Sequence, residues 1–134
     1  MGNQFFSPYR VTYLIDTNIL IDHLRGDAQA TKFLTDIETG RAKGCVSVLT
    51  EYELLSVPHL QASEAREIER LLALMPRLAI TSRVARLAAE FRRRYNTDIA
   101  DALIAATARI RSATLVTRNV KDFQRIKGLR LQKL

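Results

Sequence analysis

The sequence predicts an α/β fold, a single three-layer domain in which helices flank a mainly parallel central sheet. Short apolar segments alternate along the chain with longer ones whose apolar residues recur at helical spacing, which is typical of this class. No repeat and no Gly/Ser/Pro-rich linker divides the 134 residues, a length sufficient for one buried core. We therefore expect one domain over residues 11–134, preceded by a short N-terminal extension over residues 1–10.

The elements are predicted in order from the apolar pattern. "VTYLI" indicates a buried strand, and the residues after Asp16 are spaced as on a helix. "CVSVL" indicates a second strand that leads into a helix, and "DIADALIAATA" indicates a helix before the strand "TLVT". The expected strands are 11–15, 44–48, 78–80, 113–117 and 129–132. The expected helices are 17–25, 27–39, 49–57, 62–74, 82–95, 98–111 and 120–125. The expected N-cap residues of three of these helices are Ser63, Ser82 and either Asn96 or Thr97.

Composition limits the classes of partner and of metal site. The formal net charge of +7 and the pI near 10.1 favour a polyanionic partner such as RNA or DNA. A basic surface kept for solubility, or one neutralised by an acidic partner protein, explains the charge equally well. One cysteine and two histidines exclude an internal disulfide and the usual Cys/His zinc site. A bound metal should therefore be a hard cation on oxygen ligands.

The apolar runs are too short for a membrane protein. The longest of them, such as "ALIAATA", fall far below the roughly 20 residues that a membrane span requires. The N-terminal segment "MGNQFFSPYR" does not place a basic stretch before an apolar one, which is the pattern of a signal peptide. We therefore expect no membrane association, and the single cysteine suits the reducing cytoplasm.

Polar residues follow the ends of the predicted strands. Asp16 comes directly after the first strand, and Thr50 and Glu53 share one face of the helix after the second. Asp101 lies in the first turn of the helix before the fourth strand. Three further polar residues follow that strand: Thr117, Asn119 and Asp122. Because ligands bind beyond the carboxyl ends of parallel strands, these side chains can converge on one rim, with Asp16 at its centre.

Three carboxylates on one rim would suit a divalent cation. Asp16, Glu53 and Asp101 would raise one another's pKa, and Mg²⁺ or Mn²⁺ relieves that repulsion, activates a water and holds a scissile phosphate. Each residue also has an ordinary structural explanation. Asp16 or Asp122 can cap the helix that follows it, Asp101 can be a first-turn acid that the helix dipole favours, and Glu53 can be a solvated helix residue.

Taken together, these segments resemble the PIN-domain family, and within it the toxin ribonucleases of VapBC-type toxin–antitoxin pairs. The matching pieces occur in the family's order: "YLIDTNILID", "SVLTEYELL", "DIADALIAATA" and "TLVTRNVKDFQRIKGL". The resemblance implies an endoribonuclease that depends on Mg²⁺ or Mn²⁺, with tRNA as a common class of substrate. It also implies a homodimer and a small antitoxin that silences the toxin in a hetero-oligomer.

The resemblance also implies a role for each site residue. Asp16 and Asp101 would be the most direct metal ligands, and Glu53 would orient or deprotonate the attacking water. Thr117 and Asn119 would complete the polar rim. Many relatives have a fourth acidic group after the last core strand, where Asn119 stands here and Asp122 follows, so either residue could supply the fourth polar group. Ser47 and Thr50 match the family pattern, and we interpret both as structural.

Two assignments near the rim can be tested against a structure. Glu51 and Glu53 point roughly 200° apart on a helix, so one rim cannot use both, and the spacing from Thr50 favours Glu53. The basic residues expected to bind the RNA backbone are Arg118, Lys121 and Arg25, of which the first two neighbour the proposed site.

Three other interpretations remain open. A haloacid-dehalogenase-like phosphotransferase would need a second Asp where Asn18 stands. A receiver-like signalling domain would carry a phosphoacceptor Asp at a strand end, but it usually has an acidic pair near the first strand, and none precedes Asp16. A catalytically silent binding module with a PIN-like fold is the third interpretation, which the intact acidic set disfavours.

Overall fold

The computed structural model describes residues 11–134, and the expected N-terminal extension, residues 1–10, lies outside the described residues. Five parallel strands form one sheet in the order β3-β2-β1-β4-β5. The strands are β1 (Thr12–Ile15), β2 (Lys43–Ser47), β3 (Arg77–Leu78), β4 (Thr114–Thr117) and β5 (Arg130–Lys133). All the predicted strands are present within two residues of their expected bounds.

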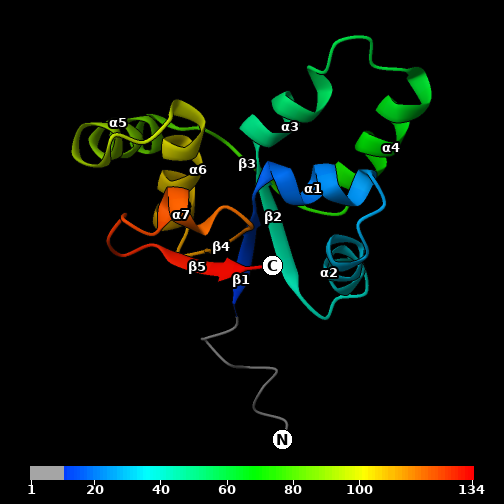
Figure 1. Cartoon of the computed structure of the whole chain (residues 1–134), viewed down its shortest axis with the longest axis horizontal. Helices are drawn as coiled ribbons and strands as arrows, with labels where there is room; N and C mark the ends of the chain where they lie inside the picture. The colour runs from blue at the N-terminus through cyan, green and yellow to red at the C-terminus, as the bar shows by residue number, and fades with distance from the viewer. Residues whose placement is uncertain (1–10) are drawn as a thin grey trace, which may run out of the picture.

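Seven helices in the described part of the chain cover the sheet on both faces, which confirms the predicted fold class. They are α1 (Thr17–Leu24), α2 (Ala28–Glu38), α3 (Val48–Leu55), α4 (Ala62–Leu72), α5 (Ser82–Tyr95), α6 (Ile99–Ile110) and α7 (Val120–Phe123). The first four lie on one side of the sheet and the last three on the other (Figure 1). None of the helices in residues 11–134 combines the length and the apolar character that a bilayer crossing needs.

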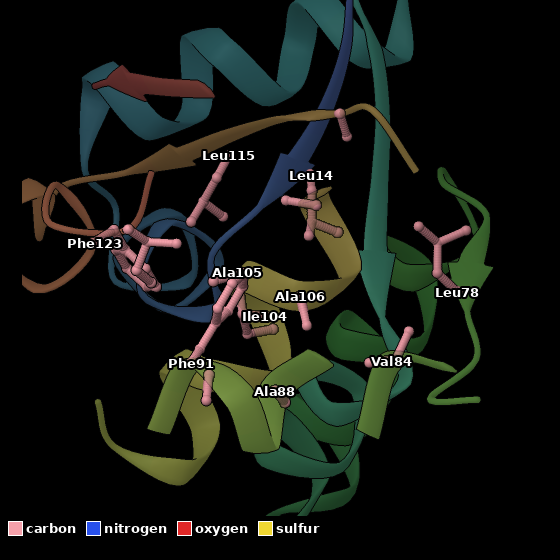
Figure 2. Close-up of a cluster of buried hydrophobic side chains, with 14 of the residues drawn as sticks. Leu14, Leu78, Val84, Ala88, Phe91, Ile104, Ala105, Ala106, Leu115 and Phe123 are labelled. Carbon is pink, nitrogen blue, oxygen red and sulfur yellow. The ribbon is translucent and has the colours of Figure 1, made fainter. Parts of the chain in front are cut away.

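The strands read as continuous apolar segments because both of their faces are buried. Successive side chains on a strand point to opposite faces of the sheet. Leu14 and Leu115 therefore point towards α5, α6 and α7, where they meet Phe91, Ile104 and Phe123 (Figure 2). On the other face, Ile15, Val46 and Val116 pack among the apolar residues of α1 to α4. Two apolar layers thus hold the central strands rigidly on either side.

The predicted N-caps are wrong by one or two residues. Thr81, not Ser82, caps α5, because Thr81 has the extended backbone and its side chain accepts a hydrogen bond from the Val84 amide at 3.2 Å. α4 begins after Gln61, whose backbone amide donates to the Glu64 carboxylate at 2.9 Å, so Ser63 lies inside the helix. The cap position of α6 is occupied by Asp98.

Asn96 and Thr97 do not cap α6. Asn96 ends α5 in a left-handed conformation, with a φ of 53°, which asparagine tolerates better than most residues. Thr97 lies between this residue and the Asp98 cap and is buried. The short connection places the first turn of α6 at the rim of the sheet.

Candidate active site

The pairing of β1 with β4 brings Asp16 beside Thr117. Ile15 lies opposite Val116 in the parallel register, and the Asp16 amide donates to the Val116 carbonyl at 3.0 Å. The Thr117 hydroxyl then donates to Asp16 Oδ2 at 2.8 Å, although the two residues are 101 positions apart. Asp16 occupies the N-cap position of α1, but its side chain makes no capping bond. Its carboxylate is therefore not explained as a helix cap.

A chain of hydroxyl groups holds Glu53 on the same rim. The Thr17 hydroxyl donates to Glu53 Oε1 at 2.6 Å and lies 2.9 Å from the Thr50 hydroxyl. Since Thr17 has a single hydroxyl proton, Thr50 must be the donor in the second bond. Both threonines are buried. Because the Thr17 hydroxyl contacts both Thr50 and Glu53, the prediction that these two residues share one helix face is confirmed.

Glu51 lies away from this rim. Its carboxylate forms an ion pair at 3.5 Å with Arg77, on the edge strand β3. Ser47, the last residue of β2, caps α3 by accepting a hydrogen bond from the Leu49 amide at 3.0 Å. Glu51 and Ser47 thus have structural partners of their own, as expected from the sequence.

Asp101 lies in the first turn of α6 and faces four other carboxylates. Burial and the charges of Asp122, Asp16, Asp98 and Glu53 raise the pKa of Asp101 to about 6. Burial also raises the pKa of Asp16, hydrogen bonds from Thr117 and the Thr17 backbone lower it, and the charges of Glu53 and Asp122 add to the increase. The rim therefore concentrates negative charge.

Asp98 is the rim carboxylate that the sequence reasoning missed. Its residue type alone marks it as no more than a helix cap. In the fold it lines a polar hollow of about 320 Å³ together with Asp101, Asp122 and Lys121. The signal that could have found it is its position, three residues before Asp101 and therefore on the same side of the helix start.

Two candidates for the fourth polar group take different positions. The backbone amide of Asn119 donates to the Thr117 hydroxyl at 2.9 Å, and the Asn119 side chain is exposed at the start of α7. Asp122 is also exposed, and its charge raises the pKa of both Asp16 and Asp101. Electrostatically, Asp122 is the residue that acts as a fourth acid on this rim.

The three basic residues expected to bind RNA are in unlike surroundings. Lys121 lines the polar hollow beside Asp101 and Asp122. Arg25 follows the last residue of α1, about 14 Å along the helix from Asp16, and lines an apolar groove of about 250 Å³ between α1, α3 and α4. Of the three basic residues, only Lys121 lies among the carboxylates of the rim.

Arg118 is held by two other carboxylates. Its guanidinium donates to Asp22 at 2.8 Å and to Asp27 at 2.7 Å, and it also reaches the Gln29 side chain at 3.2 Å. The Arg118 hydrogen bond holds the pKa of Asp27 below its usual range. We call Arg118, Asp22 and Asp27 the arginine clamp. Because the clamp has a net charge of −1, Arg118 is not a free cation next to the site.

The carboxylates do not form a closed metal cage. Within residues 11–134, no group of three or more His, Cys, Asp or Glu side chains is close enough together to hold a metal ion. One oxygen of Asp16 and one of Glu53 are already engaged by threonine hydroxyls. This donor set fits Mg²⁺ or Mn²⁺, because Mg²⁺ typically binds through one or two carboxylates and completes its shell with waters and substrate phosphates.

Comparison with known proteins shows the family of this chain. The family model of the PIN domain matches residues 13–129. The chain is 35% identical over 115 residues to "Ribonuclease VapC19" of Mycobacterium tuberculosis (strain ATCC 25618 / H37Rv), covering 82% of this chain and 90% of that protein.

Solved structures show the same fold. A "Toxin-antitoxin complex from Klebsiella pneumoniae" has a chain with 28% identity and a TM-score of 0.74, covering 87% of this chain and 94% of that one. A chain of VapBC2 from Rickettsia felis, bound to a DNA fragment from their promoter, has a TM-score of 0.81 at 22% identity, covering 92% of this chain and 99% of that one.

Proposed function

This chain belongs to the PIN domain family, and from that membership and its acidic rim we propose that it is an endoribonuclease, the toxin of a VapBC-type toxin–antitoxin pair. The observation that carries the proposal is the position of Asp16, fixed by Thr117 at the end of β1 within reach of the charges of Glu53, Asp101 and Asp122. Family membership excludes the receiver and haloacid-dehalogenase alternatives. The silent binding module differs only in activity, so cleavage assays decide it.

We propose that Asp16 and Asp101 hold Mg²⁺ or Mn²⁺ directly, with Glu53 beside them and Asp122 as a possible further ligand. When bound, the cation supplies a more acidic water and neutralises charge on the scissile phosphate. Five carboxylates around one rim and the raised pKa of Asp101 support a cation there. Asn119 and Thr117 complete the polar side of the same rim.

The chain's own residues orient the reacting groups. Thr117 holds one oxygen of Asp16 by a hydrogen bond of 2.8 Å. Thr17 likewise occupies one oxygen of Glu53, and the second oxygen has no hydrogen-bond partner within residues 11–134, so it can accept a proton from the attacking water. Lys121 lies in the polar hollow beside Asp101, where it can contact a phosphate of the bound strand.

We further propose the partners that the family implies. These are RNA, with tRNA as the substrate class, a small cognate antitoxin that blocks the rim, and a second copy of the chain in a homodimer. Two of the compared structures are, by name, a toxin–antitoxin complex and a VapBC pair, which supports the antitoxin. We place the protein in the cytoplasm, where its RNA substrates are.

Metal-dependent cleavage is tested with purified protein. RNA should be cut with Mg²⁺ or Mn²⁺ and left intact with EDTA. Asp16→Asn and Asp101→Asn should each lower the rate by at least about 100-fold, as the loss of a group acting directly on the transition state does. Cleavage that persists after exhaustive chelation would refute the metal. A folded wild-type protein that binds RNA and never cuts it would favour the silent module.

The toxin role is tested in cells. Regulated expression of the chain in a bacterial host should arrest growth, and co-expression of the gene adjacent to it should relieve the arrest. The Asp16→Asn variant is the matched control, because it keeps the fold and lacks the activity. Harmless accumulation of soluble, folded wild-type protein would contradict the toxin. Sequencing of RNA 5′ ends after induction would identify the substrate.

A further inference from the structure

The positive charge of the chain is concentrated away from the acidic rim. Three adjoining hollows lie along one edge of the molecule, and consecutive hollows share lining residues. Arg109 and Ser112 line both the first and the second hollow, and Ala113 lines both the second and the third. Six cations surround them, which we call the basic edge: Lys43, Arg83, Arg86, Arg109, Arg111 and Arg130.

The basic edge and the acidic rim are at opposite ends of the strands. Lys43 and Arg130 are the first residues of β2 and β5, and Arg111 precedes β4, whereas Asp16 and Thr117 lie where β1 and β4 end. In Figure 1, β1 and β2 begin at their lower ends, and the rim lies at their upper ends, where α1 and α3 begin. A four-residue β-strand spans about 13 Å, which is the approximate separation of the two surfaces along the strands.

Acidic residues do not neutralise the basic edge. Among residues 11–134, none of its six cations forms an ion pair with a carboxylate. The one carboxylate in the hollows, Glu90, pairs with Arg94 at 3.3 Å. All six cations are exposed. The edge therefore presents six exposed cations that no carboxylate pairs with in the described part of the chain.

Arg109, which joins two of the hollows, is already ordered. Its guanidinium donates to the Lys127 carbonyl at 2.7 Å and packs over Gly128. A Cβ on Gly128 would lie 2.9 Å from the Arg109 guanidinium carbon, and the φ of +80° at Gly128 also disfavours a side chain. An arginine held in place loses less entropy when it binds an anion, and its planar group suits phosphate.

The acidic rim cannot attract RNA by itself. The polar hollow beside Asp101 contains two cations, Lys121 and Arg125, against three carboxylates. Most of the affinity for an RNA backbone must therefore come from elsewhere on the chain. We propose that the basic edge binds the phosphodiester backbone of a folded RNA at a distance from the bond that is cut. This assignment of the polyanion rests on the proposed ribonuclease function.

The test measures binding of the full chain to two RNA probes in EDTA, so that cleavage plays no part. The probes are bulk transfer RNA and a single-stranded uridine hexamer. Arg86→Ala, Arg109→Ala and Arg130→Ala should each weaken transfer RNA binding at least about threefold and lower the slope of log K against log salt by about 1. Hexamer binding should weaken by less, because a short strand contacts fewer of the six cations.

Arg66→Ala is the matched control. Arg66 is an exposed helix arginine that lies outside the three hollows, so its loss should leave transfer RNA binding within about twofold. Gly128→Ala keeps every charge but displaces Arg109, and it should also weaken transfer RNA binding. Circular dichroism and thermal unfolding check that each variant is folded.

Several outcomes would overturn the inference. Transfer RNA binding that is unchanged in an Arg86→Ala, Arg109→Ala, Arg130→Ala triple variant would do so, as would an equal loss in the Arg66→Ala control. Loss of binding to polyglutamate but not to transfer RNA would assign the edge to an acidic protein instead. A chain that never cuts RNA, yet loses transfer RNA binding in these variants, would refute the proposed activity and keep this surface.

Discussion

The two halves of the acidic rim differ in how their side chains are held. The bonded half consists of Asp16, Thr17, Thr50, Glu53 and Thr117. Its threonine hydroxyls fix one oxygen of each of its two carboxylates. The open half consists of Asp98, Asp101, Asn119, Lys121 and Asp122. Within residues 11–134, their side chains form no hydrogen bond with another side chain. The bonded half lies on β1, β4 and the helices of one layer, and the open half lies on α6, α7 and the loops before them.

This difference indicates a division of labour. A carboxylate that is fixed by hydrogen bonds is preorganised and can orient a ligand at little further cost. A carboxylate without partners, whose pKa is raised by burial and by the charges of its neighbours, is costly to ionise, and a bound cation would offset that cost. We therefore expect changes in the bonded half to alter geometry and rate, and changes in the open half to alter stability and cation binding.

A loss of cleavage as large as that for Asp16→Asn is expected for Glu53. Glu53→Gln should lower RNA cleavage by about 100-fold, because it removes the carboxylate that Thr17 presents to the rim. Glu51→Gln, two residues away, should stay within a few-fold of wild type, since Glu51 pairs with Arg77 outside the site. Single-turnover cleavage of the two folded variants measures the difference. An inactive Glu51→Gln protein beside an active Glu53→Gln protein would contradict the geometry of α3.

Asp101→Asn should stabilise the metal-free protein while it abolishes cleavage. The pKa of Asp101 is about 6 in the fold against an ordinary value of 3.8, so ionisation is easier in the unfolded chain. Stability is therefore lost as the pH rises from about 4 through 6, and the amide variant escapes this loss because it does not ionise. Chemical denaturation in EDTA should show almost no gain at pH 4 and a gain of about 2 kcal/mol at pH 7.5, less than the full pKa shift implies because water screens this partly exposed carboxyl.

Glu38→Gln is the control for this stability measurement. Glu38 is exposed at the end of α2, far from the rim, and its replacement should change the free energy of unfolding by less than about 0.5 kcal/mol. An Asp101→Asn protein that is less stable than wild type at pH 7.5 would show that Asp101 has a stabilising partner in the folded chain.

Two buried threonines give a matched comparison of smaller size. Thr117→Val removes the donor to Asp16 and the acceptor of the Asn119 amide, so cleavage should fall about tenfold, the equivalent of one hydrogen bond of about 1.4 kcal/mol. Thr97→Val removes a buried hydroxyl that has no hydrogen-bond partner within the described chain, so activity and stability should hold or improve. Equal losses in both would argue against the bonded half as an orienting device.

The smallest effect distinguishes two roles of neighbouring cations. Arg118→Gln and Asp22→Asn both open the arginine clamp, and each should lower the cleavage rate a few-fold while RNA affinity stays within about twofold. Lys121→Ala should instead weaken RNA binding and reduce the salt slope by about 1. A gain in RNA affinity for Asp22→Asn would show that a released Arg118 binds RNA.

The sequence predicts the fold well because periodicity records it directly. Strands buried on both faces appear as unbroken apolar segments, and helices appear at helical spacing, so every element within residues 11–134 falls within two residues of its predicted bounds. The caps are less predictable, because Ser63 and Ser82 are suitable cap residues by type. The residue with the extended backbone decides the cap, and that depends on how the chain enters the helix.

Half of the site geometry lies beyond sequence reasoning. The placement of Asp16, Glu53 and Asp101 on one rim follows from strand ends and helix faces. The hydrogen bond from Thr17 to Glu53 joins residues that are 36 positions apart, and the arginine clamp joins residues that are 91 and 96 positions apart. No local pattern in the sequence indicates these partners. The position of the basic edge is equally hidden, because a net charge of +7 does not reveal where its cations gather.

The contact between Asp16 and Thr117 has a consequence for the order in which a cell completes this protein. One partner lies near the start of the chain, and the other is reached 101 residues later. Because β4 must pair with β1 before the rim exists, a chain still being synthesised has Asp16 without the strand that orients it. The site proposed to cut RNA therefore cannot assemble until Thr117 has left the ribosome that makes this protein.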